Sequence, residues 1–273
     1  MIPPPLAHPD FWEKQGYPTF VRFWEVCNRL LDALGRFTLN AGKPKDKNET
    51  IIRYLCISIG VSFADVGLLV GNGCGLGAMK IARTCLESAI NAEYLRLEPT
   101  EYRQFMDWSF IGQHRKLEYM RKYMPGDLAK LDPKMVARSE KRFQEVRPKF
   151  LLPNKKLRQS WSKISLRERA VKAKFEEFYG SVYMLCSELS HGSFGGLAQY
   201  VESFEGAGWQ PAIAPSLTGC REALGAAHYC TLRAVETLAA LKGTDSMPSL
   251  AVLKSDYDYA WPEKNDFAPV FTV

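Results

Sequence analysis

The stretch IIRYLCISIGVSFADVGLLV, residues 51–70, decides the fold. Apolar side chains occur on every side of this segment, a pattern typical of a helix in the centre of a protein. The charges of Arg53 and Asp65 would cost several kcal/mol at the depth of a bilayer. We therefore expect a central helix over Glu49–Val70 and no membrane partner.

Helical periodicity extends outward on both sides of this segment. An amphipathic stripe predicts the preceding helix, formed by Phe20, Phe23, Trp24, Cys27, Leu30, Leu31, Leu34 and Phe37. The following helices are expected over Ala78–Leu97, Glu101–Tyr123, Pro133–Val146, Ser165–Leu189 and Leu217–Leu241. The glycine-rich stretch Ser190–Pro215 is predicted to be a loop, and no convincing strand pattern is present.

These segments predict an all-α fold, a six- to seven-helix array in a single domain over residues 19–242. The proline-rich residues 1–18 are expected to form an irregular N-terminal segment. Residues 243–273, which include Tyr257, Tyr259 and Trp261, are expected to form an irregular aromatic tail.

The sequence GNGCGLG, residues 71–77, interrupts the helical pattern. Glycine-rich loops bind phosphates when they follow a strand and match G-x-G-x-x-G, or when they end in Gly-Lys-Ser/Thr. This cluster follows a helix and matches neither pattern. It therefore predicts a helix C-terminus and a tight turn into the next helix.

The composition is that of a globular protein, with 46% apolar and 24% charged residues, and it excludes wholesale disorder. The charge is uneven, because residues 134–174 hold 14 Lys+Arg against three Asp+Glu. This basic segment predicts binding to RNA or to an acidic protein partner, with Lys155, Lys156 and Arg158 as candidate substrate-binding residues. A solvated helical face would have the same composition, and this alternative stays open.

The seven cysteines include no C-x-x-C pair, which favours free thiols in a reducing, cytoplasmic setting. With only four histidines and no cofactor motif, we expect neither a metal site nor a cofactor.

A polar line crosses the predicted helix Ala78–Leu97. Arg83, Glu87 and Asn91 are spaced by four residues and therefore share one face. A charge in an apolar helix needs a partner, and Glu87 can be that partner for Arg83. The pair is interpreted either as a salt bridge that fixes the helix or as a guanidinium held for a phosphate.

A second polar line ends the predicted helix Ser165–Leu189. Tyr179, Tyr183 and Ser187 are spaced by four residues, and Ser190 and His191 follow one turn further on. Candidate substrate-binding residues here are Tyr179, Tyr183 and Ser190, together with Asn91 of the first polar line. A histidine at a cleft can exchange a proton near neutral pH, as general acid–base catalysis requires. The structural alternative is a C-terminal histidine that favours the helix dipole.

The stretch IARTCLESAINAEYL, residues 81–95, resembles a bacterial all-helical family of unknown function with an R-x-x-x-E helix that continues to Asn and Tyr. Such proteins also carry a Trp before a later helix that ends in Tyr, Ser and His-Gly. The matching residues here are Trp161, Tyr179, Tyr183, Ser190, His191 and Gly192. The resemblance covers about residues 20–194 and implies that Arg83, Glu87 and His191 converge.

A wider resemblance is to HEPN-type helical domains, many of which are metal-independent ribonucleases of toxin and phage-defence systems. Their R-x4–6-H motif forms a site across a dimer interface, which implies a homodimer here. Arg221 and His228 match the spacing as secondary candidates, and seven residues place both on one helical face. A pairing of Arg83 with His191 would be a non-standard version of this motif, in which the arginine and the histidine come from two different helices.

Two functions are expected from these residues. In a metal-independent ribonuclease or RNA-binding protein, His191 acts as general acid or base, Arg83 stabilises the phosphate and Glu87 orients Arg83. In a non-enzymatic interaction or regulatory module, the same three residues form a structural network. A small-molecule enzyme with a pocket between the helices is a third alternative.

Overall fold

The computed structural model describes residues 9–39, 42–191, 201–204, 208–211, 215–243 and 248–262. The chain divides into two compact units: unit 1 comprises residues 1–97 and 166–273, and unit 2 comprises residues 98–165. The basic segment 134–174 extends over both units, because unit 2 ends at Ser165.

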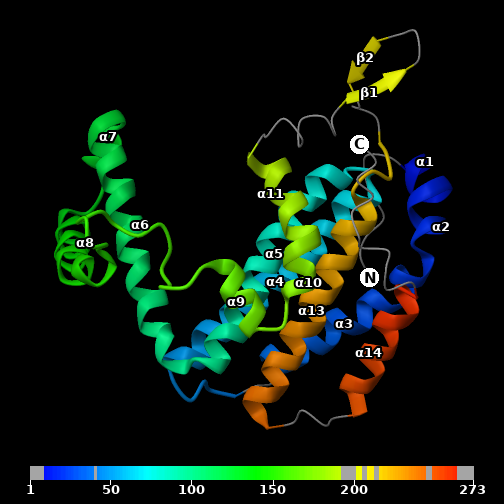
Figure 1. Cartoon of the computed structure of the whole chain (residues 1–273), viewed down its shortest axis with the longest axis horizontal. Helices are drawn as coiled ribbons and strands as arrows, with labels where there is room; N and C mark the ends of the chain where they lie inside the picture. The colour runs from blue at the N-terminus through cyan, green and yellow to red at the C-terminus, as the bar shows by residue number, and fades with distance from the viewer. Residues whose placement is uncertain are drawn as a thin grey trace. The chain divides into compact units, whose positions relative to one another are not determined.

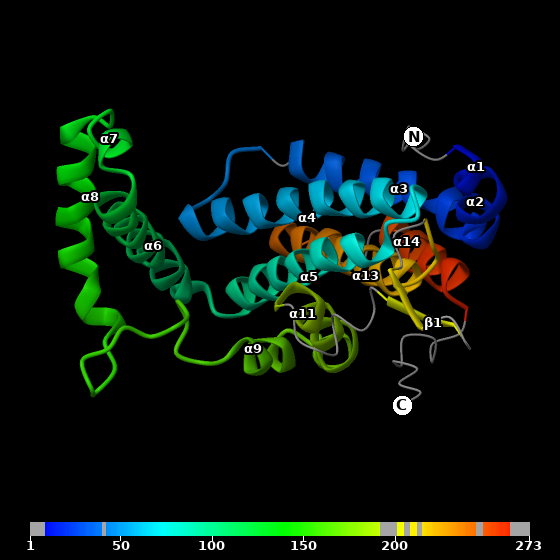
Figure 2. The ribbon, with the colours of Figure 1, turned by 90° about the horizontal axis from the view of Figure 1, so that it is seen from above.

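The centre of unit 1 is a layer of three long helices, α4 (Lys47–Gly71), α5 (Gly75–Leu97) and α13 (Cys220–Lys242), which lie side by side (Figures 1 and 2). The Asp46 carboxylate caps α4 by accepting a hydrogen bond from the Glu49 N–H at 2.8 Å. Ile52, Ile59 and Phe63 are fully buried. The predicted central helix is confirmed, and so is the glycine turn that joins it to α5.

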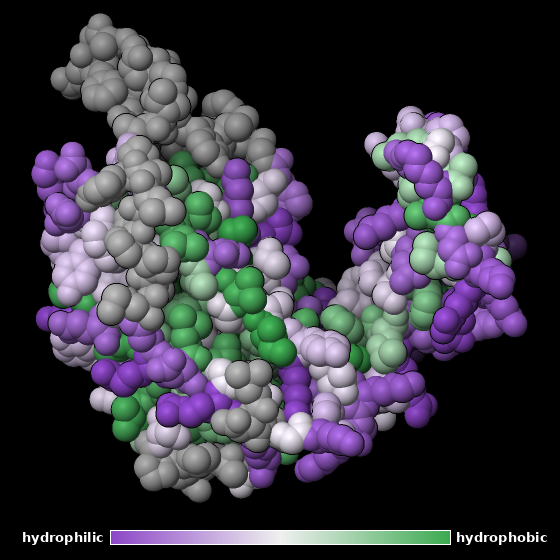
Figure 3. Space-filling view, turned by 180° about the vertical axis from the view of Figure 1, so that it is seen from behind, coloured by the Kyte–Doolittle hydropathy of each residue, from purple (hydrophilic) through white to green (hydrophobic). Residues whose placement is uncertain are grey.

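Among the described residues, α4 is a helix with the length and hydropathy of a membrane span, a property that core helices of other proteins share. It packs against α5, α13 and α3 (Val21–Leu39). Its outward face is nevertheless apolar, with Tyr54, Ile57 and Val61 exposed, and hydrophobic side chains gather on this side of the molecule in Figure 3.

The two ends of unit 1 are helical where the sequence predicted irregular chain. Residues 9–19 form α1 (Pro9–Phe11), a π-helical turn η1 (Trp12–Gly16) and α2 (Tyr17–Thr19). The expected irregular tail includes α14 (Pro248–Ala260), which packs against α3 and α13. Both predictions are wrong for the described residues. Phe11 and Trp261 are buried, and Trp261 packs against Phe23 of α3 and donates to His228 of α13, whereas Tyr17 and Tyr259 are exposed.

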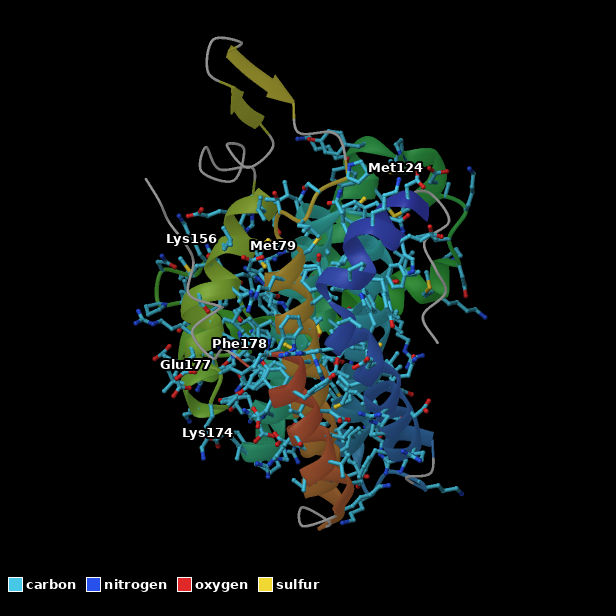
Figure 4. The ribbon with its side chains drawn as sticks, turned by 90° about the vertical axis from the view of Figure 1, so that its right-hand side faces the viewer. Met79, Met124, Lys156, Lys174, Glu177 and Phe178 are labelled. Carbon is cyan, nitrogen blue, oxygen red and sulfur yellow. The ribbon has the colours of Figure 1, made fainter. Side chains whose placement is uncertain are left out.

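The predicted helix Ser165–Leu189 is broken into several pieces. They are α9 (Leu166–Lys172), α10 (Glu176–Phe178), the π-helical turn η4 (Tyr179–Tyr183) and α11 (Met184–His191). The break lies at Lys174, labelled in Figure 4, whose φ of 58° is left-handed. Arg233 of α13 donates hydrogen bonds to the freed carbonyls of Ala173 and Lys174, both at 3.1 Å, so tertiary contacts hold the break open.

Part of the predicted loop Ser190–Pro215 is a hairpin of β1 (Val201–Phe204) and β2 (Gly208–Pro211), with Val201 opposite Pro211. That loop prediction is therefore wrong for these residues. The all-α class is confirmed, because helices dominate the described residues. The predicted six to seven helices are too few, since short helices such as α1, α7 and α10 accompany the long ones.

Unit 2 is a helical hairpin with a core of its own. It contains η2 (Pro99–Glu101), α6 (Tyr102–Tyr123), α7 (Pro125–Leu128), α8 (Pro133–Val146) and η3 (Arg147–Phe150). The Asp132 carboxylate caps α8 by accepting from the Lys134 N–H at 2.9 Å. Ile111 of α6 packs against Phe143, Val146 and Phe150. The helices predicted over Glu101–Tyr123 and Pro133–Val146 are confirmed.

Candidate functional site

The polar line predicted on α5 faces the segment that ends in α11. Arg83 Nε donates to Glu87 Oε1 at 3.1 Å, one turn along the same helix. Arg83 Nη1 lies 3.1 Å from His191 Nε2, and its Nη2 donates to the Tyr183 hydroxyl at 3.4 Å. The Tyr183 hydroxyl in turn donates to Glu87 Oε1 at 3.0 Å. Four side chains from two distant segments thus form one network around the Arg83 guanidinium.

This network lies at the surface rather than in a sealed core. The Arg83 side chain is 19% exposed and that of Glu87 is 38% exposed. His191, at the end of α11, is exposed. The convergence of Arg83, Glu87 and His191 that the family resemblance implied is therefore present, in a position that solvent can reach.

The contact between Arg83 and His191 has a defined direction. A guanidinium carries only donors, so in this contact His191 Nε2 can act only as the acceptor. Burial lowers the pKa of Arg83. The Tyr183 hydroxyl and the Glu87 carboxylate raise this pKa by more than burial lowers it, so the net shift is upward. The cluster thus pairs a permanent cation with the Nε2 atom of an exposed imidazole.

Two stacked tyrosine rings border the cluster. Tyr179 and Tyr183 lie 4.7 Å apart at an angle of 14° within the π-helical turn η4. The Arg83 guanidinium carbon lies 5.3 Å from the Tyr183 ring centroid, within the range of a cation–π contact. Burial raises the pKa of Tyr183. Irregular π-helical turns occur frequently at functional sites, which agrees with the position of η4.

Arg169 of α9 is a member of this site that the sequence analysis did not single out. It is only 4% exposed, and its Nη1 donates to Asn91 Oδ1. Burial lowers the pKa of Arg169, while nearby Tyr94, Glu87 and Tyr183 oppose that shift. Asn91 was a candidate for substrate binding, but its carbonyl oxygen is occupied by Arg169. No local signal distinguished Arg169 from the other cations of the basic segment.

The remaining candidates make other contacts or stand exposed. The Ser190 hydroxyl donates to the Cys186 carbonyl of its own helix at 2.7 Å. Lys155 and Lys156 are exposed on a turn of unit 2, whereas Arg158 donates to Gln104 and to the Lys149 carbonyl, both at 3.1 Å. Arg158 thus joins parts of unit 2, and its role in substrate binding stays a prediction.

His228, a secondary candidate with Arg221, lies in the core and not at a site. It is 1% exposed, and its Nδ1 accepts a hydrogen bond from Trp261 Nε1 at 3.1 Å. Phe23 and Tyr257 pack edge-on against its ring. Burial lowers the pKa of His228 to about 3, so it stays neutral and cannot exchange protons with a substrate near pH 7.

This burial predicts a pH dependence of stability. The folded pKa of about 3 lies below the ordinary value of 6.5, so the unfolded chain binds a proton that the folded chain does not. The free energy of unfolding should therefore fall by about 1.4 kcal/mol for each pH unit below 6.5. His228→Asn keeps an acceptor for Trp261 and removes the titration. Urea unfolding at pH 7 and pH 4.5 should show a smaller loss in this variant, and equal losses would contradict the prediction.

The fold and the site define a helical protein with a partly exposed arginine–histidine–tyrosine cluster on its central layer. The chain belongs to a family of unknown function (DUF5677), whose model matches residues 49–208. This match confirms the predicted membership of a helical family without assigned function, and it includes Arg83, Glu87 and His191 but not Arg221 or His228. No curated protein and no solved structure matches the chain.

Proposed function

We propose that this protein is a metal-independent ribonuclease whose reaction centre is Arg83 with His191. The observation that carries the proposal is the 3.1 Å contact between a permanent cation and an exposed imidazole. Phosphodiester cleavage needs a proton acceptor for the attacking hydroxyl and a cation for the phosphorane, and both are adjacent here. This is a version of the Arg–His pairing that the HEPN-type resemblance implied.

In the proposed reaction, His191 Nε2 takes the proton of a ribose 2′-hydroxyl while the 2′-oxygen attacks phosphorus. Arg83 turns one N–H from His191 to the phosphate and stabilises the added negative charge. The bond from phosphorus to the 5′-oxygen then breaks, and the proton returns to that oxygen. The products are a 2′,3′-cyclic phosphate and a 5′-hydroxyl, and the step needs no metal.

The other members of the cluster position these two groups. Glu87 and Tyr183 hold the guanidinium from two sides. Arg169 lies close enough to Glu87 for an electrostatic interaction and adds a second positive charge near Arg83. Tyr179 offers a ring beside Tyr183 for a base.

The test is cleavage of labelled RNA in EDTA by purified protein. We expect the wild type to cleave, and His191→Ala and Arg83→Ala to lower the rate at least 100-fold. Thr84→Ala changes an exposed side chain on the next position of α5 and serves as the matched control. The cleaved RNA should end in a cyclic phosphate.

Equal cleavage by all four proteins would assign the activity to a contaminant, and no cleavage by any would reject the proposal. In either case the network would be structural, as in a non-enzymatic interaction or regulatory module.

A further inference from the structure

The outward face of α6 in unit 2 combines exposed aromatic rings with cations. Successive residues of a helix are rotated by about 100° around its axis. Viewed along the axis of α6, five side chains therefore lie within about 60° of their common mean direction: Arg115, Lys116, Tyr119, Lys122 and Tyr123. We call these five residues the α6 stripe. Both tyrosines are 58% exposed, which is unusual for such large rings in a folded unit.

The α6 stripe lies opposite the face of α6 that packs against α8. On that opposite face Leu117 is buried, and His114 and Arg121 both contact Glu140 of α8. The five side chains of the stripe are all exposed, and none belongs to the hydrophobic core around Ile111. Burial in the core of unit 2 therefore does not explain why two tyrosines stand in the stripe.

The rings and cations of the stripe are arranged together. The ring centroids of Tyr119 and Tyr123 are 4.8 Å apart. Lys122 Nζ lies 4.9 Å from the Tyr123 centroid, and the Arg115 guanidinium lies 5.4 Å from the Trp108 centroid. Met124, labelled in Figure 4, is exposed directly after Tyr123. The rings thus form a short platform bordered by positive charge.

The charges of the stripe are available for an anion. In the described part of the chain, none of Arg115, Lys116 and Lys122 forms a salt bridge. The nearby Arg121, in contrast, is engaged by Glu118 and Glu140. Glu118 of α6 is therefore already paired with Arg121, and the stripe itself contains no acidic residue.

We propose that the α6 stripe binds single-stranded nucleic acid, with Tyr119 and Tyr123 stacking on bases and the three cations contacting phosphates. Proteins that bind single strands without sequence preference combine a basic track with aromatic rings on which bases stack. An acidic protein would pair with the cations but would leave the exposed tyrosine rings unused. In a nucleic-acid duplex the bases are stacked on each other, so their faces are not accessible to the tyrosine rings. The inference adds a binding surface and does not rest on cleavage at His191.

The test is fluorescence anisotropy of the full chain with a labelled 2′-O-methyl oligouridine, which lacks the 2′-hydroxyl and cannot be cleaved through it. Tyr119→Ala with Tyr123→Ala removes the rings and keeps the charge, and we expect the Kd to rise at least tenfold. Lys116→Gln with Lys122→Gln should lower the slope of log K against log salt by about 1.4. Lys43→Gln with Lys47→Gln removes two exposed cations of unit 1 as the matched control and should change neither quantity.

Competition identifies the occupant. Unlabelled single strand should displace the probe, whereas a duplex of equal length, polyglutamate and phosphatidylserine vesicles should compete at least tenfold less well. The proposal is rejected if the tyrosine double variant binds within twofold of wild type while its melting temperature is unchanged. It is also rejected if duplex or vesicles compete as well as the single strand.

Discussion

Arg53→Ala is expected to lower the free energy of unfolding by about 3–5 kcal/mol, whereas Arg83→Ala should lower it by about 1 kcal/mol or less. Both arginines pair with a glutamate one turn away on a helix, Arg53 with Glu49 and Arg83 with Glu87. The side chains of the first pair are only 10% and 9% exposed. Removal of Arg53 therefore leaves a carboxylate buried without its main cation, while solvent reaches Glu87.

The surroundings of the first pair explain the size of this effect. Arg53 Nη1 also donates to the Gly42 carbonyl at 2.6 Å, and Glu49 Oε2 accepts from the Lys45 N–H at 2.9 Å. Burial raises the pKa of Glu49, but the Lys45 N–H and Arg53 together bring it below its ordinary value. The pair therefore ties the residues before α4 to the helix.

Urea unfolding followed by circular dichroism measures both variants. Glu49→Leu combined with Arg53→Met removes both charges and should recover part of the loss, because a buried pair replaced by apolar side chains is often tolerated. If Arg53→Ala and Arg83→Ala cost the same, the difference in burial does not govern their stability.

Gly75→Ala is expected to cost about 3 kcal/mol or more, and Gly77→Ala to stabilise by about 0.5–1 kcal/mol. A Cβ at Gly75 would lie 2.1 Å from the Thr218 carbonyl oxygen and 2.6 Å from the Cys220 nitrogen. These are backbone atoms at the start of α13, so relief requires a shift of one helix against the other. A Cβ at Gly77 meets nothing within 4 Å, and alanine favours the helix.

The same unfolding measurement applies to this pair of variants. The two glycines are two residues apart in one helix, so Gly77→Ala controls for a change in helix propensity alone. A transition midpoint of Gly75→Ala equal to that of wild type would show that the two helices separate without cost.

Local patterns predicted the long helices well, because a helix with one buried face has apolar residues spaced by three and four positions in the sequence. The Phe20–Phe37 stripe forms α3, and the Pro133–Val146 segment forms α8 with the predicted bounds. The same method failed between Ser165 and Leu189. There the break at Lys174 depends on hydrogen bonds from Arg233, about 60 residues away in the chain, and no local pattern contains that partner.

The candidate site could be predicted in part. The four-residue spacing placed Arg83 and Glu87 together, and their contact with His191 agrees with the convergence that the family resemblance implied. Arg169 was missed, and the spacing of Arg221 and His228 was misleading, since His228 is sealed among aromatic rings. Spacing along one helix says which side chains share a face, but it does not say what covers that face.

The sequence by itself determined the all-α class, the positions of the long helices and the turn at the glycine cluster, because these depend on neighbours within one or two helical turns. Only the tertiary structure decided which of two similar Arg–Glu pairs is buried, which glycine touches another helix, and which histidine reaches solvent. Those properties depend on atoms brought together from distant parts of the chain. For this protein, the exposed contact of Arg83 with His191 and the outward rings of α6 are such properties, and the proposed functions rest on them.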